Sequence, residues 1–332
     1  MTDGRTRHQL IDVHAHYVSP EQSAQRAQQA RARNFVTDPS LGWSPGAAIE
    51  FMDAHDIGMQ LISSPRPLGP EAARRINDYG AAVVAHNPDR FGLLANIPLG
   101  TPDEALKEIA RAMEELGAAG FVIGSNYDGR LLGDDFFIPI FEELNIRRAT
   151  VLLHPVEPAG FDLVSCGRPG PLIEFPFDTA RTVVDAIYAQ LFQRYPDFAL
   201  ILAHGGGALP TLAHRIAQLG TRSSLVPGLT GLTSKDIEEQ IAGLYYDTAI
   251  AGGPTALAPL LEVTGADHVL FGTDYLPAGI ETIEANYVAL LSSTLISSKQ
   301  LAATTETALR LFPGISDRFR NIQRCSATSF ES

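Results

Sequence analysis

The chain has 332 residues, of which 45% are hydrophobic, and its formal net charge is −13. A chain of this length buries a substantial core, and its acidic balance, with no cluster of lysine and arginine, excludes nucleic acid as an expected partner. Residues 1–9 lack the apolar core of a secretory signal, and no apolar run reaches the roughly 20 residues that span a bilayer. With only two widely spaced cysteines, Cys166 and Cys325, we expect a soluble cytoplasmic protein without a membrane partner.

Eight short apolar runs are predicted to be β-strands. The runs are continuous rather than alternating, which is typical of parallel strands that are buried on both faces. Their approximate ranges are 10–16, 59–64, 90–97, 120–126, 149–154, 198–204, 243–248 and 268–274.

A helical pattern is predicted to follow each of these strands. We expect helices beginning after Ser44, at about residues 70–86 and 102–116, around 137–144, from Asp178 onward, through Arg215, and twice after the eighth strand. Two connections are unusually long. The first holds a polar segment at 20–35 and the loop with Trp43, and the second, about 155–177, is rich in proline and glycine and is predicted to be a loop. The polar tail from about residue 316 is expected to order only by lying on the surface or on a partner.

This order predicts a (β/α)8 TIM-type barrel with long loops after strands one and five, in a single domain over residues 1–332. An open, doubly wound sheet would give a similar count of elements. It is less favoured because no glycine-rich phosphate-binding loop follows the first strand.

Side chains that can bind a metal ion lie at the ends of four predicted strands. His14 and His16 end the first strand, His154 the fifth, His204 the sixth and Asp274 the eighth. Each of these residues could instead have a purely structural role, such as capping a strand end or the next helix. The carboxyl ends of barrel strands form one face, where active sites lie, so five such groups there favour a metal centre.

Four segments resemble the amidohydrolase superfamily. Its branch of aminocarboxymuconate-semialdehyde and hydroxybenzoate decarboxylases, such as 6-methylsalicylate decarboxylase, is the most similar, over residues 11–312. The segments are Asp-Val-His-Ala-His at 12–16, Leu-His-Pro at 153–155, Ala-His-Gly-Gly-Gly-Ala-Leu-Pro at 203–210 and Phe-Gly-Thr-Asp-Tyr at 271–275.

The resemblance implies one divalent ion, usually zinc and sometimes manganese. Its ligands would be His14, His16, His154 and Asp274, with His204 beside the ion and with His204 and Asp274 as the catalytic residues. A second ion is disfavoured, because Asn126 stands after the fourth strand where two-metal relatives carry a bridging lysine.

Five residues are predicted to bind the substrate. Trp43, Phe175 and Phe177 would form an apolar slot for a ring, although aromatic residues in loops also serve as anchors. Arg66, after the second strand, would bind a carboxylate unless it is a solvated loop arginine. Arg215 matches a family arginine that reaches across a homodimer interface toward the neighbouring site; its alternative role is an ion pair with a surface acid.

The first functional hypothesis is a metal-dependent, non-oxidative decarboxylase of a small hydroxylated aromatic or unsaturated carboxylic acid. The metal would chelate the carboxylate and a neighbouring hydroxyl, and Asp274 or His204 would protonate the carbon. The second hypothesis is a hydrolase of an ester, lactone or amide on the same site, in which Asp274 takes a proton from the attacking water. A third is a barrel that has lost activity and serves as a binding protein, which the intact ligand set disfavours.

Overall fold

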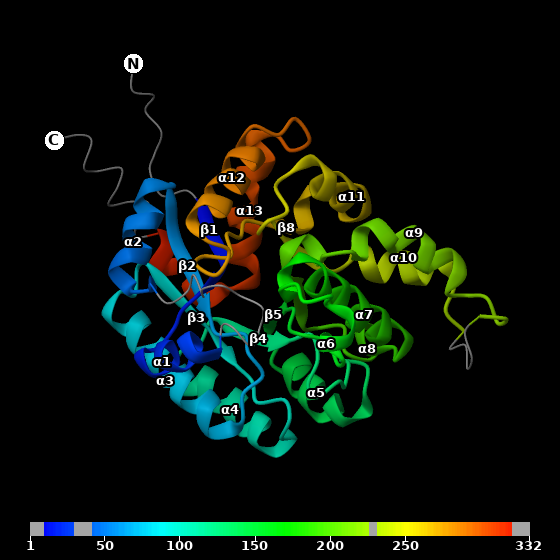
Figure 1. Cartoon of the computed structure of the whole chain (residues 1–332), viewed down its shortest axis with the longest axis horizontal. Coiled ribbons are helices and arrows are strands. Elements are labelled where there is room, and N and C mark those ends of the chain that lie inside the picture. Colours follow the sequence, from blue (N-terminus) through cyan, green and yellow to red (C-terminus); the bar gives the residue numbers. More distant parts are fainter. Residues whose placement is uncertain (1–9, 30–41, 226–230, 321–332) are drawn as a thin grey trace.

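The computed structural model describes residues 10–29, 42–225 and 231–320, and these form a parallel β-barrel surrounded by helices (Figure 1). The strands are hydrogen-bonded in sequence order, as expected for a chain that alternates strands and helices. They are β1 (Leu10–His16), β2 (Ile57–Ser63), β3 (Phe91–Asn96), β4 (Gly120–Gly124), β5 (Thr150–His154), β6 (Ala199–Leu202), β7 (Tyr245–Asp247) and β8 (Val269–Leu270).

The barrel closes between β1 and the segment that follows β8. The backbone N–H of Val13 donates to the carbonyl of Phe271 at 3.0 Å, and the N–H of Asp274 donates to the carbonyl of His14 at 2.8 Å. Ala15 also forms a parallel bridge with Tyr275. These contacts leave no open edge and rule out the doubly wound sheet. The eighth strand is shorter than the predicted range 268–274, because β8 ends at residue 270. The bonds to β1 lie in the segment that follows it.

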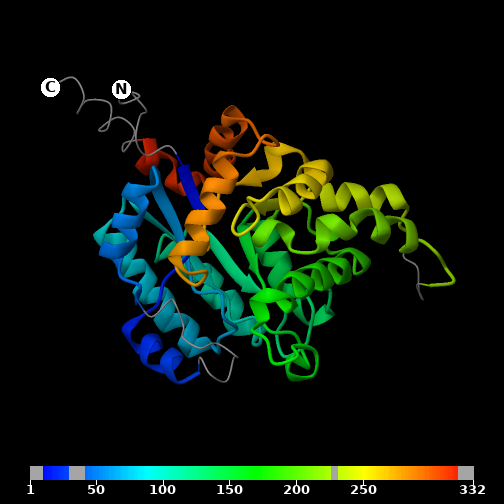
Figure 2. The same cartoon turned by 45° about the horizontal axis from the view of Figure 1, so that its top comes forward.

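Helices cover the outside of the barrel, and their apolar faces pack on the outward side chains of the strands (Figure 2). Ser44 caps the helix that begins at Pro45, as expected, by accepting a hydrogen bond from the N–H of Ala47. The α-helices are α1 (Pro20–Gln29), α2 (Pro45–Ala54), α3 (Pro70–His86), α4 (Pro102–Glu114), α5 (Ile138–Ile146), α6 (Phe161–Val164), α7 (Glu174–Tyr188), α8 (Leu191–Arg194), α9 (Leu209–Leu219), α10 (Ser234–Ala242), α11 (Pro254–Thr264), α12 (Ile280–Leu291) and α13 (Ser298–Leu311). None of them combines the length and hydropathy needed to cross a bilayer in the described part of the chain.

The amino-terminal end of the barrel is plugged by the last described segment of the chain. Phe312, Ile315 and Phe319 are fully buried there, together with inward side chains of the strands such as Ile11 and Val122. Residues 316–320 are helical. The expectation of a surface tail from residue 316 is therefore wrong for this part, since Phe319 is a core residue; residues 321–332 lie outside the described ranges.

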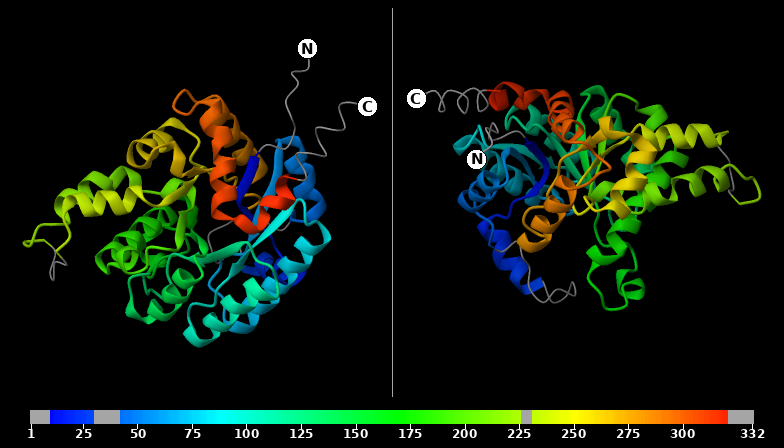
Figure 3. Two further views of the ribbon diagram at one scale, coloured as in Figure 1. Left: turned by 180° about the vertical axis from the view of Figure 1, so that it is seen from behind. Right: turned by 90° about the horizontal axis from the view of Figure 1, so that it is seen from above.

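The two long connections lie at the opposite, carboxyl-terminal end of the strands. In the view from above, α1 and the segment around α6 both project from that end, away from α13 (Figure 3). The predicted loop at 155–177 contains α6, and α7 begins at Glu174 instead of Asp178. The first connection contains α1, and its residues 30–41 lie outside the described ranges.

Candidate metal centre

Three imidazoles and one carboxylate converge at the carboxyl end of the barrel. One ligand atom from each of His14, His16, His154 and Asp274 lies within 4.8 Å of the others, and all four residues are buried. They come from the ends of β1 and β5 and from the segment after β8. The structure thus brings together the four residues predicted as metal ligands.

Each of the three imidazoles is held through its Nδ1 atom, so that its Nε2 atom is left for the centre. The Nε2 atoms of His14 and His16 lie 3.0 Å apart. Outer groups of this kind fix the orientation of metal-binding histidines. The partners are Asp247 Oδ2 for His14 at 2.6 Å, Ser63 Oγ for His16 at 3.1 Å and the carbonyl of Pro155 for His154 at 2.8 Å.

Asp274 supplies the oxygen of the set. Its Oδ1 atom lies 3.1 Å from Nε2 of His16 and 3.6 Å from Nε2 of His14. This oxygen is buried and accepts no hydrogen bond from another described residue. A buried carboxylate oxygen without a hydrogen bond is costly unless another group neutralises it, and a divalent cation among imidazole and carboxylate ligands would do so. The residues present therefore fit a metal ion.

His204 stands beside the four ligands. Its Nε2 atom lies 3.4 Å from Asp274 Oδ2, and its ring centroid is 4.9 Å from that of His14. Its side chain is 18% exposed, whereas those of the other three histidines are buried. This position at the open side of the cluster suits a group that contacts a substrate.

Both His204 and Asp274 have left-handed backbone conformations, with φ of 57° and 59°. Such angles are costly for residues other than glycine and occur mainly where the surroundings enforce them, as at functional sites. The N–H of His204 donates to Asp247 Oδ1 at 2.8 Å, which holds this turn. The turn continues through three glycines of positive φ, and a Cβ atom at Gly206 would meet the ring of Tyr246 at 2.7 Å.

The charges of the cluster shift the pKa values of its members. Burial lowers the pKa of His16 to about 4, and burial together with the neighbouring histidines holds that of His154 well below its ordinary value. Burial opposes protonation of His14 as well, but the Asp247 carboxylate raises its pKa to about 9. Burial would raise the pKa of Asp274, yet contacts with His16 and His204 keep it well below its ordinary value. Asp274 is therefore ionised at neutral pH.

Asp247 is the residue that sequence reasoning missed. It is fully buried and accepts hydrogen bonds from His14 Nδ1 and from the N–H groups of His204 and Ala249. It ends β7, and the rule that drew attention to Asp274 after the eighth strand would also have found it. Asp12 precedes the two histidines on β1, but its carboxylate accepts from Gln60 and Thr273, and it lies outside the ligand set.

Asn126, at the position of the lysine in two-metal relatives, takes part in a different network. Its Nδ2 atom donates to Asp178 Oδ2 at 2.8 Å and to the carbonyl of Glu157 at 3.1 Å. Asp178 also accepts from Ser125 and Arg181. The network joins the end of β4 to α7 and to the loop after β5, so Asn126 positions the wall of the site.

None of the predicted substrate-binding residues belongs to the four-residue cluster. Trp43 is buried against Tyr17 and Tyr79, with ring centroids 6.1 and 6.4 Å away. Arg66 is half-buried in the loop after β2, where its carbonyl accepts from Asn96 Nδ2.

Phe175 and Phe177 lie in the first turn of α7. Phe175 is half-buried with its ring over Gly170, and Phe177 is 47% exposed. Arg215 is exposed on α9 and forms no ion pair with another described residue. The alternative of an ion pair with a surface acid is therefore not met within the described part of this chain.

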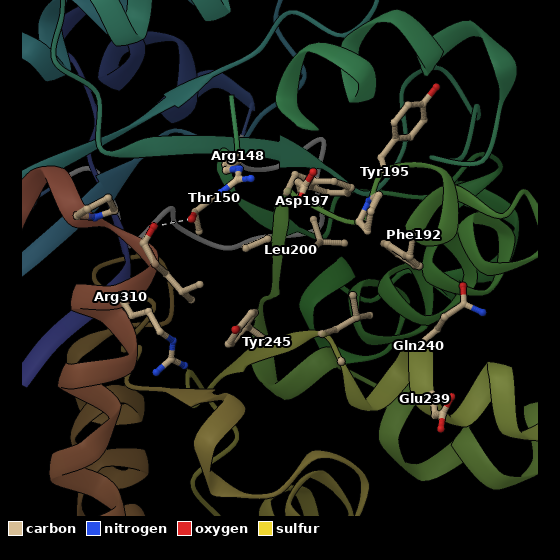
Figure 4. A pocket seen from close by; sticks show the side chains of 17 residues that line it. Arg148, Thr150, Phe192, Tyr195, Asp197, Leu200, Glu239, Gln240, Tyr245 and Arg310 are labelled. Atoms are coloured by element: carbon tan, nitrogen blue, oxygen red, sulfur yellow. Dashed lines mark hydrogen bonds between the residues drawn. The ribbon is translucent and has the colours of Figure 1, made fainter. Parts of the chain in front are cut away.

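A separate hollow of about 620 Å³ opens at the amino-terminal end of β5, β6 and β7 (Figure 4). Thr150, Tyr245 and Arg310 are among its lining residues. It lies at the end of the barrel opposite the histidine cluster, and none of the four candidate ligands lines it. We therefore place the candidate chemistry at the cluster.

The amidohydrolase family profile matches residues 11–282, which is most of the chain and includes all four candidate ligands. The chain belongs to this family. The fold and the ligand cluster thus agree with the resemblance inferred from the four segments.

Similar proteins include several decarboxylases. Decarboxylase yanB of Aspergillus niger is 34% identical over 91% of this chain and 87% of its own length. The 6-methylsalicylic acid decarboxylase of Penicillium expansum is 33% identical over 93% of this chain and 98% of its own. The crystal structure of a dihydroxybenzoic acid decarboxylase from Polaromonas sp. JS666, with bound manganese and 2-nitroresorcinol, superposes with a TM-score of 0.76 over 92% of this chain and 96% of its own. At 23% identity, this last match shows a shared fold.

Proposed function

We propose that this protein is a metal-dependent, non-oxidative decarboxylase of a small hydroxylated aromatic acid. The observation that carries the proposal is the convergence of three Nε2 atoms and an unpartnered carboxylate oxygen, with His204 at the open side. The relatives above support decarboxylation over hydrolysis, because those at 33 to 34% identity are named decarboxylases.

In this proposal His14, His16, His154 and Asp274 hold one divalent ion. When bound, the ion would supply a Lewis acid that holds the substrate carboxylate and an adjacent hydroxyl. Three imidazoles and a carboxylate suit zinc, which we propose as the resident ion, and they also accept manganese, the ion in the solved Polaromonas enzyme.

The reaction needs a proton at the ring carbon that loses its carboxyl group. Because Asp274 is ionised in the free protein, it must first accept a proton from water; Asp274 and His204, 3.4 Å apart, are then proposed to deliver that proton to the ring carbon. The bond between the ring carbon and the carboxyl carbon then breaks, its electron pair stays with the ring, and carbon dioxide leaves. His204 is suited to the final transfer because it is the most exposed histidine of the cluster.

The ring would lie between the loops at the mouth of the barrel. We propose that Phe175 and Phe177 form one wall, since the first turn of α7 lies directly against Gly207, three residues from His204. Arg66 and Trp43 belong to connections at the same end of the barrel and are proposed to contact the substrate from the other side.

A homodimer would complete the site in this proposal. The segment before α7 and the first turn of α7 carry several exposed apolar side chains. They are Leu163, Val164, Leu172, Ile173 and Phe177. A second copy could cover them, and Arg215 is exposed on the neighbouring α9, in a position to reach a partner chain. We also propose a reducing, cytoplasmic setting, which suits the exposed free thiol of Cys166.

The test compares two sets of substrates with metal-loaded protein. One set contains salicylate-type acids, and the other contains lactones and esters of similar size. Release of carbon dioxide from the acids, with loss of the carboxyl group shown by mass spectrometry, is expected. Acid release from the esters alone would replace the proposal with the hydrolase. Purified protein with no stoichiometric divalent ion would instead favour a barrel without catalysis.

A further inference from the structure

Helix α1 carries a buried arginine at the mouth of the barrel. Arg26 is 6% exposed, although this helix otherwise consists mainly of glutamine, alanine, serine and glutamate. Arginine is seldom buried to this degree unless a neighbouring group compensates its charge. The segment that carries it follows the metal-binding strand β1 after only three residues.

Hydrogen bonds fix which face of α1 looks toward the site. Ser19 and Gln22 cap the start of the helix, and Gln22 Nε2 donates to Ser64 Oγ at the end of β2. Ser64 follows Ser63, whose Oγ atom is bonded to Nδ1 of His16. The first turn of α1 is therefore fastened beside the His16 ligand.

Arg26 comes four residues after Gln22. Residues four apart lie on the same face of a helix, so the guanidinium shares the face that Gln22 turns toward the end of β2. Side chains of a helix also lean toward its amino terminus, which brings that of Arg26 back over the Gln22 turn. Glu21, which precedes Gln22, has its Oε2 atom 3.7 Å from Nε of Arg75 on α3.

The buried side chain of Arg26 therefore shares the helix face of Gln22, whose contact Ser64 adjoins Ser63, the hydrogen-bond partner of His16. This geometry places Arg26 on the His16 side of the centre.

The combination suits an anionic ligand. The four candidate ligands include a single carboxylate, Asp274, and the guanidinium of Arg26 adds a positive charge at this end of the barrel. Arginine offers two parallel N–H groups that match the two oxygens of a carboxylate. In a chain of net charge −13, such a local positive site is needed to hold an acid.

We propose that Arg26 is a substrate-binding residue that holds the carboxylate of the ring acid on the His16 side of the metal centre. The inference rests on the proposed function and names the group that distinguishes the acid from the neutral phenol formed when carbon dioxide leaves. Because the negative charge of the carboxylate disappears as neutral carbon dioxide forms, the contact is strongest in the bound acid. Its loss therefore raises KM more than it lowers kcat.

The test measures binding of the acid and of its decarboxylated product. 6-Methylsalicylate and 3-methylphenol are titrated calorimetrically into zinc-loaded protein, in a His204→Ala background so that the acid is not consumed. Arg26→Met is expected to raise the Kd of the acid at least tenfold and to leave that of the phenol within twofold. Arg26→Lys keeps the positive charge but lacks the two parallel N–H groups of arginine, and it is expected to weaken acid binding three- to tenfold.

Arg75→Met is the matched control, because it removes an exposed arginine that contacts α1 outside the site; both Kd values should stay unchanged. Melting temperature and zinc content are measured for every variant. Unchanged acid binding in both Arg26 variants, or equal weakening of acid and phenol, would overturn the assignment. If Arg26→Met does not fold, the lysine variant alone decides between these outcomes.

Binding is measured without turnover, so the two proposals can fail separately. If Arg26→Met weakens acid binding but the parent protein releases no carbon dioxide, the proposed decarboxylase activity is contradicted and the inference about Arg26 stands. If the parent enzyme decarboxylates the acid and Arg26→Met changes neither KM nor the Kd of the acid, only the inference about Arg26 is contradicted.

Discussion

The Oδ2 atom of Asp247 lies 2.6 Å from Nδ1 of His14, so a carboxylate that ends β7 holds the imidazole of a candidate metal ligand on β1. The other oxygen of Asp247 accepts the N–H of His204. One buried side chain thus sets the positions of a candidate ligand and of His204, which stands beside the four candidate ligands.

Asp247→Asn is expected to weaken zinc binding by roughly 10- to 100-fold, because the neutral amide no longer polarises His14 or fixes its ring. Competition with a chromophoric chelator measures the change. Asp197→Asn, at an exposed site on the opposite end of the barrel, is the control and should bind zinc like the parent. Equal affinities for the Asp247 variant and the parent would contradict the role of this carboxylate.

His154→Ala and His204→Ala are expected to separate metal binding from catalysis. The first removes a candidate ligand, and the purified protein should contain far less than one zinc ion per chain. The second should keep most of its divalent ion but lose roughly 10²- to 10⁴-fold in kcat, as expected for a group that transfers a proton. Metal analysis by mass spectrometry and initial rates measure both effects. Equal loss of metal in the two variants would mean that His204 is itself a ligand.

Zinc binding should depend on pH through His14. In the metal-free protein its pKa is about 9, whereas burial keeps His16 and His154 neutral at pH 7. Below pH 9 one proton must therefore leave His14 when the ion binds, so affinity should rise about tenfold per pH unit between pH 7 and 9 and then level off. Calorimetry in two buffers of different ionisation enthalpy counts the released protons. A count near zero at pH 7.5 would contradict the proton on His14.

Gly207→Ala should displace the wall that carries Phe175 and Phe177. Gly207 has a φ of 60°, and a Cβ atom there would overlap the backbone of Pro176. The expected cost is about 1–3 kcal/mol of folding free energy, together with a raised KM for the acid. Gly46→Ala is the matched control, since nothing lies near its Cβ position. Chemical denaturation and initial rates measure the two effects; a Gly207 variant as stable as the Gly46 variant would contradict the close contact.

Much of the site could be predicted from the sequence, because a barrel brings the carboxyl ends of all its strands to one face. His14, His154 and Asp274 could be placed on one face once their runs were recognised as successive parallel strands. The eighth strand was predicted too long, since Asp274 is held by a backbone bond to His14 across the closure, which no local pattern reveals. Arg26 was not singled out because a polar helix shows no sign of which side chain it buries.

Other differences have similar causes. The start of α7 at Glu174 was missed because Pro176 and the aromatic residues around it read as a loop. Phe319 was assigned to a polar tail because its neighbours are charged, yet tertiary packing buries it beneath the barrel.

The backbone bond between Asp274 and His14 joins positions 260 residues apart in the chain. During synthesis, the oxygen ligand leaves the ribosome long after the first two imidazoles, and with it comes the segment that closes the ring of strands. The four candidate ligands are therefore complete, and the ring of strands is closed, only after the segment that follows β8 has been synthesised.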